Sequence, residues 1–225
     1  MKIISYNIFE GVANGRDRLA DFISGHAPDV LCLQEANGWD VDEQRVAKEF
    51  AQKVGMPNLV FGVSNTEYHL AVLSRKPFIK TEVHTKGIWH CAIHATVPYG
   101  DSELQLWNVH LDPRTEDNRV AEAKLLLSLM GTGQQTLAMG DFNSLSPDDD
   151  YPDDLLQQLL KQGVKKFGET ELRFDVMKTF AAGGMIDTAH KLGTADSSVP
   201  TPANKDADHA AKLRLDYLLA SQEAL

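Results

Sequence analysis

The chain has 225 residues, 43% of them hydrophobic, a length that suits one large domain with a sizeable core. Its 32 acidic residues outnumber its 22 basic ones, and the formal net charge is -10. Because an acidic surface repels polyanions, this charge disfavours partners such as extended DNA or RNA.

Two cysteines, Cys32 and Cys91, lie inside the apolar runs "VLCLQ" and "WHCAI". This context predicts reduced core residues in a reducing compartment rather than a disulfide. The chain begins with the strand-like pattern "KIISYNIF", which lacks a signal-peptide cleavage site. No apolar run approaches the roughly 20 residues that cross a bilayer. We therefore expect a soluble, cytoplasmic protein.

Strand and helix patterns alternate in the first part of the chain. Residues 2–9 predict a strand, and residues 29–35 predict a short buried one. An amphipathic helix is expected over 14–29, and a second over 42–55, where Gly55 marks its end.

The middle of the chain is rich in short strand patterns separated by turn residues. Neighbouring strands of this kind pair antiparallel. The predicted strands cover residues 58–63, 69–74, 78–85, 88–97 and 103–111.

The last part returns to mixed patterns. A helix is expected over 115–130, with Val120, Leu127 and either Ala123 or Lys124 near its inner face. Many strands flanked by helices favour one domain over residues 1–225, with two packed sheets and helices outside. The remaining predicted elements are strands at 135–139 and 213–221, helices at 153–163 and 173–184, and a loop over 194–208.

Several predicted strands finish in polar side chains that could converge. Strand ends are often polar simply because they meet solvent. Glu35 and Asp216, however, are embedded in apolar sequence, where an ionised carboxylate is costly unless it is paired or bound to a metal. Hard oxygen ligands with amides and an imidazole suit Mg²⁺ or Mn²⁺ better than structural zinc. The set comprises Asn7, Glu35, His110, Asp141, Asn143 and Asp216.

Six motifs follow one another along nearly the whole chain: "SYNIFEG", "PDVLCLQE", "HLAVLSRKPF", "NVHLDPRTEDNRVAEA", "GDFNSLSP" and "LRLDYLLAS". In this order the chain resembles the endonuclease/exonuclease/phosphatase superfamily, the metal-dependent phosphoesterases related to DNase I. The resemblance implies an α/β fold: a four-layer α/β/β/α sandwich of two mixed, largely antiparallel sheets flanked by helices. The active site would lie at one edge, between loops from both sheets.

The resemblance also implies roles for individual residues. Glu35 would be the principal Mg²⁺ or Mn²⁺ ligand, with Asn7 beside it holding the metal or a phosphate oxygen. His110 would hydrogen-bond a phosphate oxygen. Asp141 would orient and deprotonate the attacking water, and Asn143 would hold that water or the developing charge.

Asp216 would orient the catalytic histidine that relatives carry in an Asp-His segment after this strand. The chain ends at Leu225 before such a segment, so we expect the last strand and the Asp-His segment to be missing. Asp208 and His209 precede the strand and offer a substitute pair, although a solvated loop histidine is the favoured interpretation.

Other residues carry weaker signals. Arg114 follows His110 closely enough to reach a substrate phosphate, and His69 stands where relatives often place a polar residue that lines the site. His90 and His94 alternate in "WHCAIHA" and could form a two-histidine metal site, although a polar sheet face is favoured. The basic cluster at 161–167 is expected to be a solvated helix end.

The leading hypothesis is a Mg²⁺- or Mn²⁺-dependent phosphoesterase that directs water in line at a phosphodiester or phosphomonoester. By elimination, its substrate is a small phosphorylated metabolite, an inositol phosphate or a short nucleotide, and we expect a monomer. Two alternatives stay open: a non-catalytic module that binds a phosphate ligand, and a DNA endonuclease or exonuclease.

Overall fold

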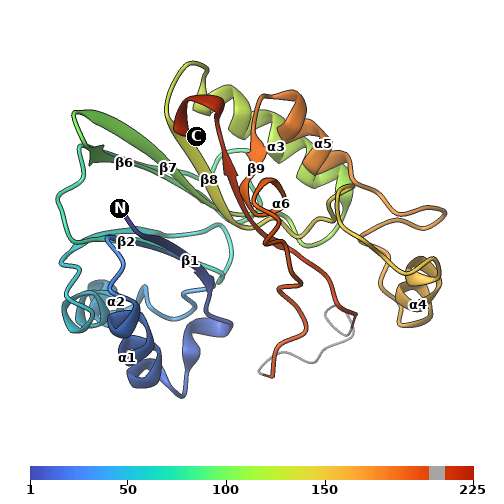
Figure 1. The fold of residues 1–225 in the computed structure, drawn as a ribbon. Helices are drawn as coiled ribbons and strands as arrows, with labels where there is room; N and C mark the ends of the chain where they lie inside the picture. Colours follow the sequence, from blue (N-terminus) through green and yellow to red (C-terminus); the bar gives the residue numbers. More distant parts are fainter. Residues whose placement is uncertain (203–210) are drawn as a thin grey trace.

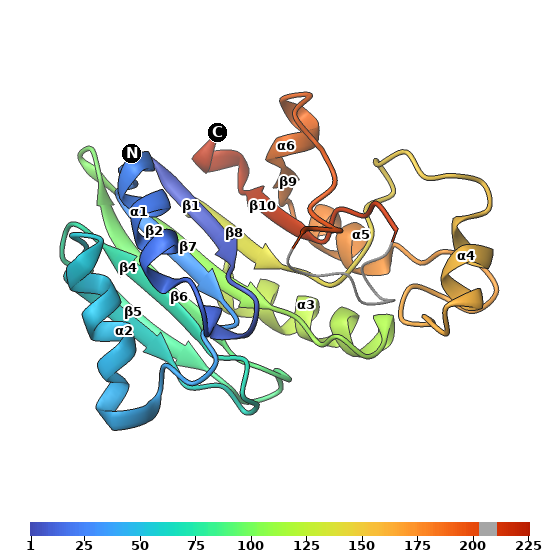
Figure 2. The same ribbon diagram turned by 90° about the horizontal axis from the view of Figure 1, so that it is seen from below.

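The computed structural model describes residues 1–202 and 211–225. Two β-sheets pack face to face, and helices cover the outer face of each sheet (Figures 1 and 2). The four-layer sandwich expected from the resemblance is confirmed.

The first sheet has four strands and contains the N-terminus. β1 and β2 run parallel, whereas β4 pairs antiparallel with both β2 and β3. In sheet order, the strands are β1 (Ile3–Asn7), β2 (Val30–Gln34), β4 (Leu70–Ser74) and β3 (Asn58–Gly62).

The second sheet has six strands, of which only the pair β7 and β8 is parallel. Both sheets are therefore mixed and largely antiparallel, as expected. In sheet order, the strands are β5 (Lys80–His84), β6 (Ala92–Tyr99), β7 (Ser102–His110), β8 (Thr136–Asp141), β10 (Asp216–Ala220) and β9 (Ile186–Asp187).

The helices divide between the two outer faces. α1 and α2 lie against the four-stranded sheet, α3 and α5 lie against the six-stranded sheet, and α4 stands at one end of the molecule (Figure 1). None of the helices in the described ranges has the length and apolar character needed to cross a membrane. Their bounds are α1 (Arg16–His26), α2 (Val41–Lys53), α3 (Glu116–Met130), α4 (Leu155–Lys161), α5 (Asp175–Ala182) and α6 (Thr188–Lys191), with short 3₁₀ turns at Glu10–Val12 and Gln222–Ala224.

The inner face of α3 differs in part from the prediction. Ala123 is buried as predicted, and Val120 and Leu127 pack against the core while partly exposed, but Glu116 and Arg119 are also buried. Apolar periodicity missed this part of the face because the two buried charges pair with each other, and that pairing is not visible in a hydrophobic pattern.

A buried amide joins the two sheets directly beneath the strand ends. Asn108 on β7 donates from Nδ2 to the carbonyls of Leu33 and Ala71, at 2.9 and 3.0 Å. Its Oδ1 accepts a bond of 2.6 Å from Gln34 Nε2. Because Glu35 follows Gln34 and His110 lies two residues after Asn108, this link fixes the two sheets relative to each other where the polar residues converge.

Candidate active site

Strand register places three of the predicted residues side by side on the six-stranded sheet. His110 at the end of β7 pairs with Asp141 at the end of β8. Asp141 in turn pairs with Asp216 at the start of β10. The four-stranded sheet contributes Asn7, whose Cα partner is Gln34, and Glu35, which follows β2.

Asn7 connects the carboxylates of the two sheets. Its Nδ2 donates to Glu35 Oε1 at 2.9 Å and to Asp141 Oδ2 at 3.2 Å, while its Oδ1 accepts the N–H of Phe9 at 3.0 Å. The other oxygen of Glu35 accepts the N–H of Glu10 at 3.0 Å. Both carboxylates are thus oriented by fixed donors before any ligand binds.

The backbone turns sharply at two of these residues. Glu35 has φ +60° and Asn143 has φ +51°, the left-handed region that non-glycine residues rarely adopt. Such conformations cost of order 1–3 kcal/mol each and cluster at functional sites. Gly140 is required by close approach, since a Cβ there would lie 2.0 Å from the Val109 carbonyl oxygen.

The carboxylates repel one another. Burial, followed by the negative charge of Asp141, raises the pKa of Asp216 to about 8. Burial also raises the pKa of Glu35, and the charge of Asp141 adds to that rise although Asn7 opposes it. Candidate ligand atoms of Glu35, His110 and Asp141 lie within 4.8 Å of one another. A divalent cation would relieve this repulsion, and the oxygen-rich donor set fits Mg²⁺ or Mn²⁺.

His110 is buried and neutral. Burial, together with the positive charge of Lys166, lowers its pKa to about 3, so its contact of 3.6 Å with Asp141 Oδ2 is not an ion pair at neutral pH. Its ring stacks on His90 at a centroid distance of 4.3 Å. A neutral imidazole can donate one N–H to a phosphate oxygen, as expected for this residue.

The hypothesis of a metal site shared by His90 and His94 is wrong. His90 stacks on His110, whereas His94 stacks on Trp107 at 4.6 Å. The strand β6 begins only at Ala92, so strict alternation does not extend back to His90.

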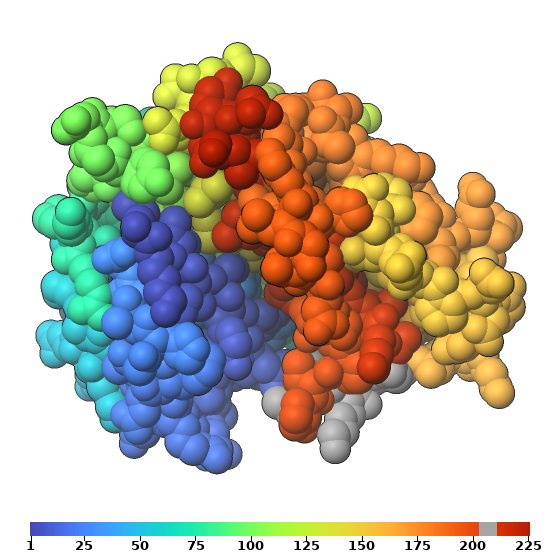
Figure 3. Space-filling view, in the orientation of Figure 1, coloured from blue at the N-terminus to red at the C-terminus, as the bar shows by residue number. Residues whose placement is uncertain are grey.

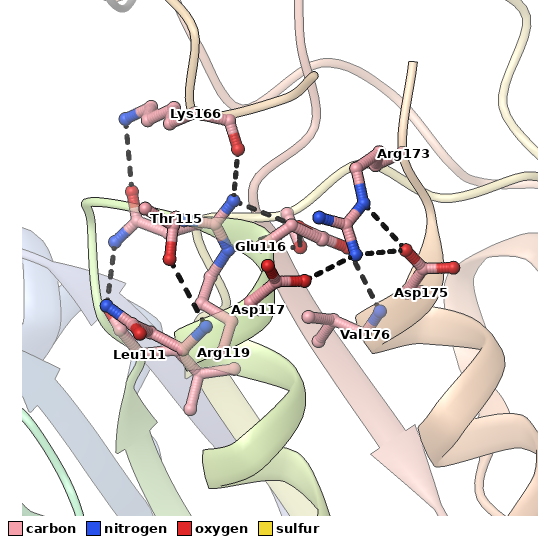
Figure 4. A network of polar contacts seen from close by, with 12 residues as sticks. Leu111, Thr115, Glu116, Asp117, Arg119, Lys166, Arg173, Asp175 and Val176 are labelled. Carbon is pink, nitrogen blue, oxygen red and sulfur yellow. Dashed lines mark hydrogen bonds and ion pairs between the residues drawn. The ribbon is translucent and has the colours of Figure 1, made fainter. Parts of the chain in front are cut away.

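Lys166 is a candidate site residue that the sequence prediction missed. Lys166 is only 8% exposed, and its Nζ donates to Asn143 Oδ1 at 3.3 Å, while Asn143 Nδ2 donates to the Leu111 carbonyl at 3.1 Å. Figure 4 shows Lys166 close to Arg119. The prediction of a solvated basic cluster fails at this residue, although Lys165 is exposed and pairs with Glu169. Nothing in "KQGVKKF" distinguishes the buried lysine from its neighbour.

Arg119 holds Lys166 in place. Its guanidinium is fully buried and donates to the backbone carbonyl of Lys166 at 2.6 Å (Figure 4). It also donates to the backbone carbonyl of Asp112 at 2.9 Å. It also pairs with Glu116 at 2.9 Å, and Ser144 donates to the same carboxylate at 2.6 Å. The network therefore ties the segments after β7 and β8 to helix α3.

The two predicted substrate-binding residues have partners within the protein. Arg114 forms a bidentate pair with Asp112 and lies over the Trp89 ring. His69 accepts the N–H of Ser64 at Nδ1, and its Nε2 lies 3.3 Å from Asp40. Roles for Arg114 and His69 in substrate binding remain predictions. Asp208 and His209, the proposed substitute pair, lie outside the described residues.

A cleft of about 740 Å³ opens above the carboxylates. Tyr6, Phe9 and Phe22 line one wall and are 38–47% exposed, with Arg18 nearby, and residues from the segment 198–202 line the other wall. The space-filling view shows the surface hollowed between the dark-blue N-terminal segment and the orange segment (Figure 3). The site is therefore open to a small ligand along an aromatic wall.

Comparisons with known proteins agree with the fold. A search of curated proteins finds no match. An AP endonuclease from Archaeoglobus fulgidus has 15% identity and a TM-score of 0.71, and the match covers 99% of this chain and 87% of the other. A 3′ phosphatase, NExo, from Neisseria bound to a product DNA hairpin has 16% identity and a TM-score of 0.70, with the same coverage.

An endonuclease/exonuclease/phosphatase from Beutenbergia cavernae DSM 12333 has 17% identity and a TM-score of 0.67. The match covers 99% of this chain but only 64% of the length of that one. At these identities the likeness shows the fold alone. A family model matches residues 4–225, and the chain therefore belongs to the Endonuclease/Exonuclease/phosphatase family.

Proposed function

We propose that the protein is a Mg²⁺- or Mn²⁺-dependent phosphoesterase that hydrolyses a phosphodiester or phosphomonoester with water. The observation that carries this proposal is the convergence of Glu35, Asp141 and Asp216, from two sheets, in the lining of one open cleft, with His110 beside Asp141. Carboxylates held together against their mutual repulsion are typical of a cation site.

Glu35 would hold the metal ion, with Asn7 beside it orienting its carboxylate and that of Asp141. When bound, such an ion neutralises phosphate oxygens and stabilises the leaving oxygen. The contact with Asn7 supports Glu35 as the principal ligand.

The remaining side chains would act on water and phosphate. Asp141 orients the attacking water and accepts its proton. His110 donates an N–H to a non-bridging oxygen, and Lys166, held by Asn143 at 3.3 Å, stabilises charge as it develops on the phosphate. Burial of both His110 and Lys166 strengthens these interactions because the local dielectric is low.

The cleft favours a small phosphate ester that carries an apolar or aromatic group. Tyr6, Phe9 and Phe22 present ring surface beside the carboxylates, and Tyr6 and Phe22 lie with ring centroids 6.0 Å apart. A short nucleotide would place its base against this wall and its phosphate over the carboxylates. A small phosphorylated metabolite and an inositol phosphate remain proposed substrates, and their binding would depend less on contact with the aromatic wall.

DNA is a second candidate substrate, because two proteins with the same fold are an AP endonuclease and a 3′ phosphatase bound to a DNA hairpin. The net charge of -10 argues against extended duplex binding.

We also propose that residues 1–225 act as one domain and as a monomer, since both sheets supply the site. The two buried free thiols favour the cytoplasm as its location.

A phosphoesterase panel tests the proposal. The full-length protein would be assayed with Mg²⁺, Mn²⁺ or EDTA on bis-p-nitrophenyl phosphate, dinucleotides, inositol phosphates and abasic DNA. We expect metal-dependent release from the diester and dinucleotides. Binding of nucleotide without turnover would favour the non-catalytic module, and nicking of DNA that weakens steeply with salt would favour the nuclease.

A further inference from the structure

A second cluster of metal-ligating side chains lies on the six-stranded sheet, apart from the active site. Glu82 and His84 alternate on the edge strand β5 and therefore face the same side of the sheet. His94 on β6 is the direct cross-strand partner of Glu82. Register alone thus brings two imidazoles and a carboxylate together.

The three side chains have the separation that a metal site needs. Glu82 Oε2 lies 3.3 Å from His94 Nδ1 and 4.0 Å from His84 Nε2. The candidate ligand atoms all lie within 4.8 Å of one another. With bonds of about 2.0–2.2 Å, a tetrahedral ion holds its ligand atoms about 3.3–3.6 Å apart. Small side-chain rotations would complete the site.

The rings are already held by neighbouring residues. His94 stacks on Trp107 with an interplanar angle of 3°, and its Nε2 lies 3.3 Å from Thr96 Oγ1. This contact leaves Nδ1 to face Glu82. His84 also stacks on Trp107, at a centroid distance of 5.2 Å. Such outer contacts orient histidine ligands in metal sites.

The surroundings of His84 Nε2 favour a metal site over a simple ion pair between Glu82 and the histidines. Within the described part of the chain, His84 Nε2 is buried and has no hydrogen-bond partner. A pair between Glu82 and His94, with Lys80 at 3.1 Å from the same oxygen, accounts for the carboxylate but not for that nitrogen.

We propose that Glu82, His84 and His94 bind a transition-metal ion of the Zn²⁺ class, with water completing the coordination. Two imidazoles and one carboxylate suit Zn²⁺, Co²⁺ or Ni²⁺, in contrast to the oxygen-rich donors at the active site. The ion would fasten the exposed edge strand β5 to β6. This site is independent of the proposed reaction.

Titrations of the full chain with Zn²⁺ by calorimetry and with Co²⁺ by visible absorption test the proposal. The variants are His84→Ala and Glu82→Gln for this site, Glu35→Gln for the active-site cluster, and His190→Ala as an exposed-histidine control. We expect Co²⁺ ligand-field bands that persist in Glu35→Gln and His190→Ala. His84→Ala and Glu82→Gln should bind at least about tenfold more weakly.

Circular dichroism would establish that each variant is folded, and the exposed Glu82 provides a variant that leaves the core intact. Zn²⁺ should also raise the melting temperature of the wild type and of Glu35→Gln, but not that of His84→Ala. A wild type without such bands, bands retained in both site variants, or bands lost only in Glu35→Gln would overturn the proposal.

Discussion

At the scale of single residues, two side chains have separate proposed roles. Asp141 accepts the proton of the attacking water, and Lys166 stabilises the charge that develops on the phosphate. Asp141 is fixed by Asn7, and its Oδ1 accepts the N–H of Asn143 at 2.8 Å. Lys166 is fixed at both ends, by Asn143 at the amine and by Arg119 at the backbone carbonyl. Each can therefore be changed with a defined expectation.

Replacement of Asp141 by Asn should lower the rate of ester hydrolysis by on the order of 10² or more, because the amide cannot accept the proton of water. Initial rates at saturating metal measure the effect. An unchanged rate would show that Asp141 is not the general base.

Replacement of Lys166 by Met should lower the rate by roughly 10², the loss typical of one charge-stabilising donor in a buried site. The neighbouring Lys165→Met variant is the matched control, because Lys165 is exposed and pairs with Glu169. Both variants should first be shown to melt as cooperatively as the wild type. Equal rates in Lys166→Met and Lys165→Met would then show that Lys166 does not stabilise charge in the reaction.

At the scale of elements, buried polar side chains connect strands and helices around the site. Asn108 joins the two sheets, and Glu122 on α3 accepts the backbone N–H groups of Trp89 and Asp112. These contacts hold the loops before β6 and after β7. Their loss should change stability in ways that can be measured.

Glu122 predicts a pH dependence of stability. Burial raises the pKa of Glu122 from 4.5 to about 7. Between pH 4.5 and about 7, Glu122 is therefore protonated in the folded state but ionised in the unfolded state. The free energy of unfolding should therefore fall as pH rises through this window, by up to about 1.4 kcal/mol per pH unit. Denaturant melts of Glu122→Gln should show a flatter profile, whereas the exposed Glu103→Gln should keep the wild-type slope. Parallel profiles for all three proteins would contradict the assignment.

Asn108→Ala should lower the free energy of unfolding by at least about 2 kcal/mol, because it leaves the Leu33 and Ala71 carbonyls without their donor in the interior. Asn58→Ala is the control, since Asn58 also donates to two carbonyls but at a partly exposed edge strand. If the two variants lose the same small amount in urea melts, the link between the sheets is not a main source of stability.

At the scale of the whole molecule, sequence reasoning reached the architecture because the strands follow strong patterns. The apolar runs at 29–35 and 135–139 predicted β2 and β8, and the ordered motifs identified the sandwich. The strand β9 was not predicted, because a segment of two residues has no periodicity.

The candidate site was partly predictable for a related reason. Asn7, Glu35, His110, Asp141 and Asp216 stand at strand ends, where local sequence marks them. Lys166 and Arg119 reach the site by tertiary contacts from a loop and a helix, which no local pattern records. The cluster of Glu82, His84 and His94 was not predicted, because Glu82 and His84 come from another strand than His94.

The dependence of hydrolysis on Mg²⁺ in the wild type and in Glu35→Gln tests the central claim most directly, with bis-p-nitrophenyl phosphate as substrate. Glu35 is held by Asn7 and Glu10 toward Asp141, so loss of its charge should weaken the cation site. The wild type should be inactive in EDTA and regain activity with Mg²⁺. Glu35→Gln should need at least about tenfold more Mg²⁺ for half-maximal rate. A metal-independent wild type, or the same Mg²⁺ requirement in both proteins, would contradict the account.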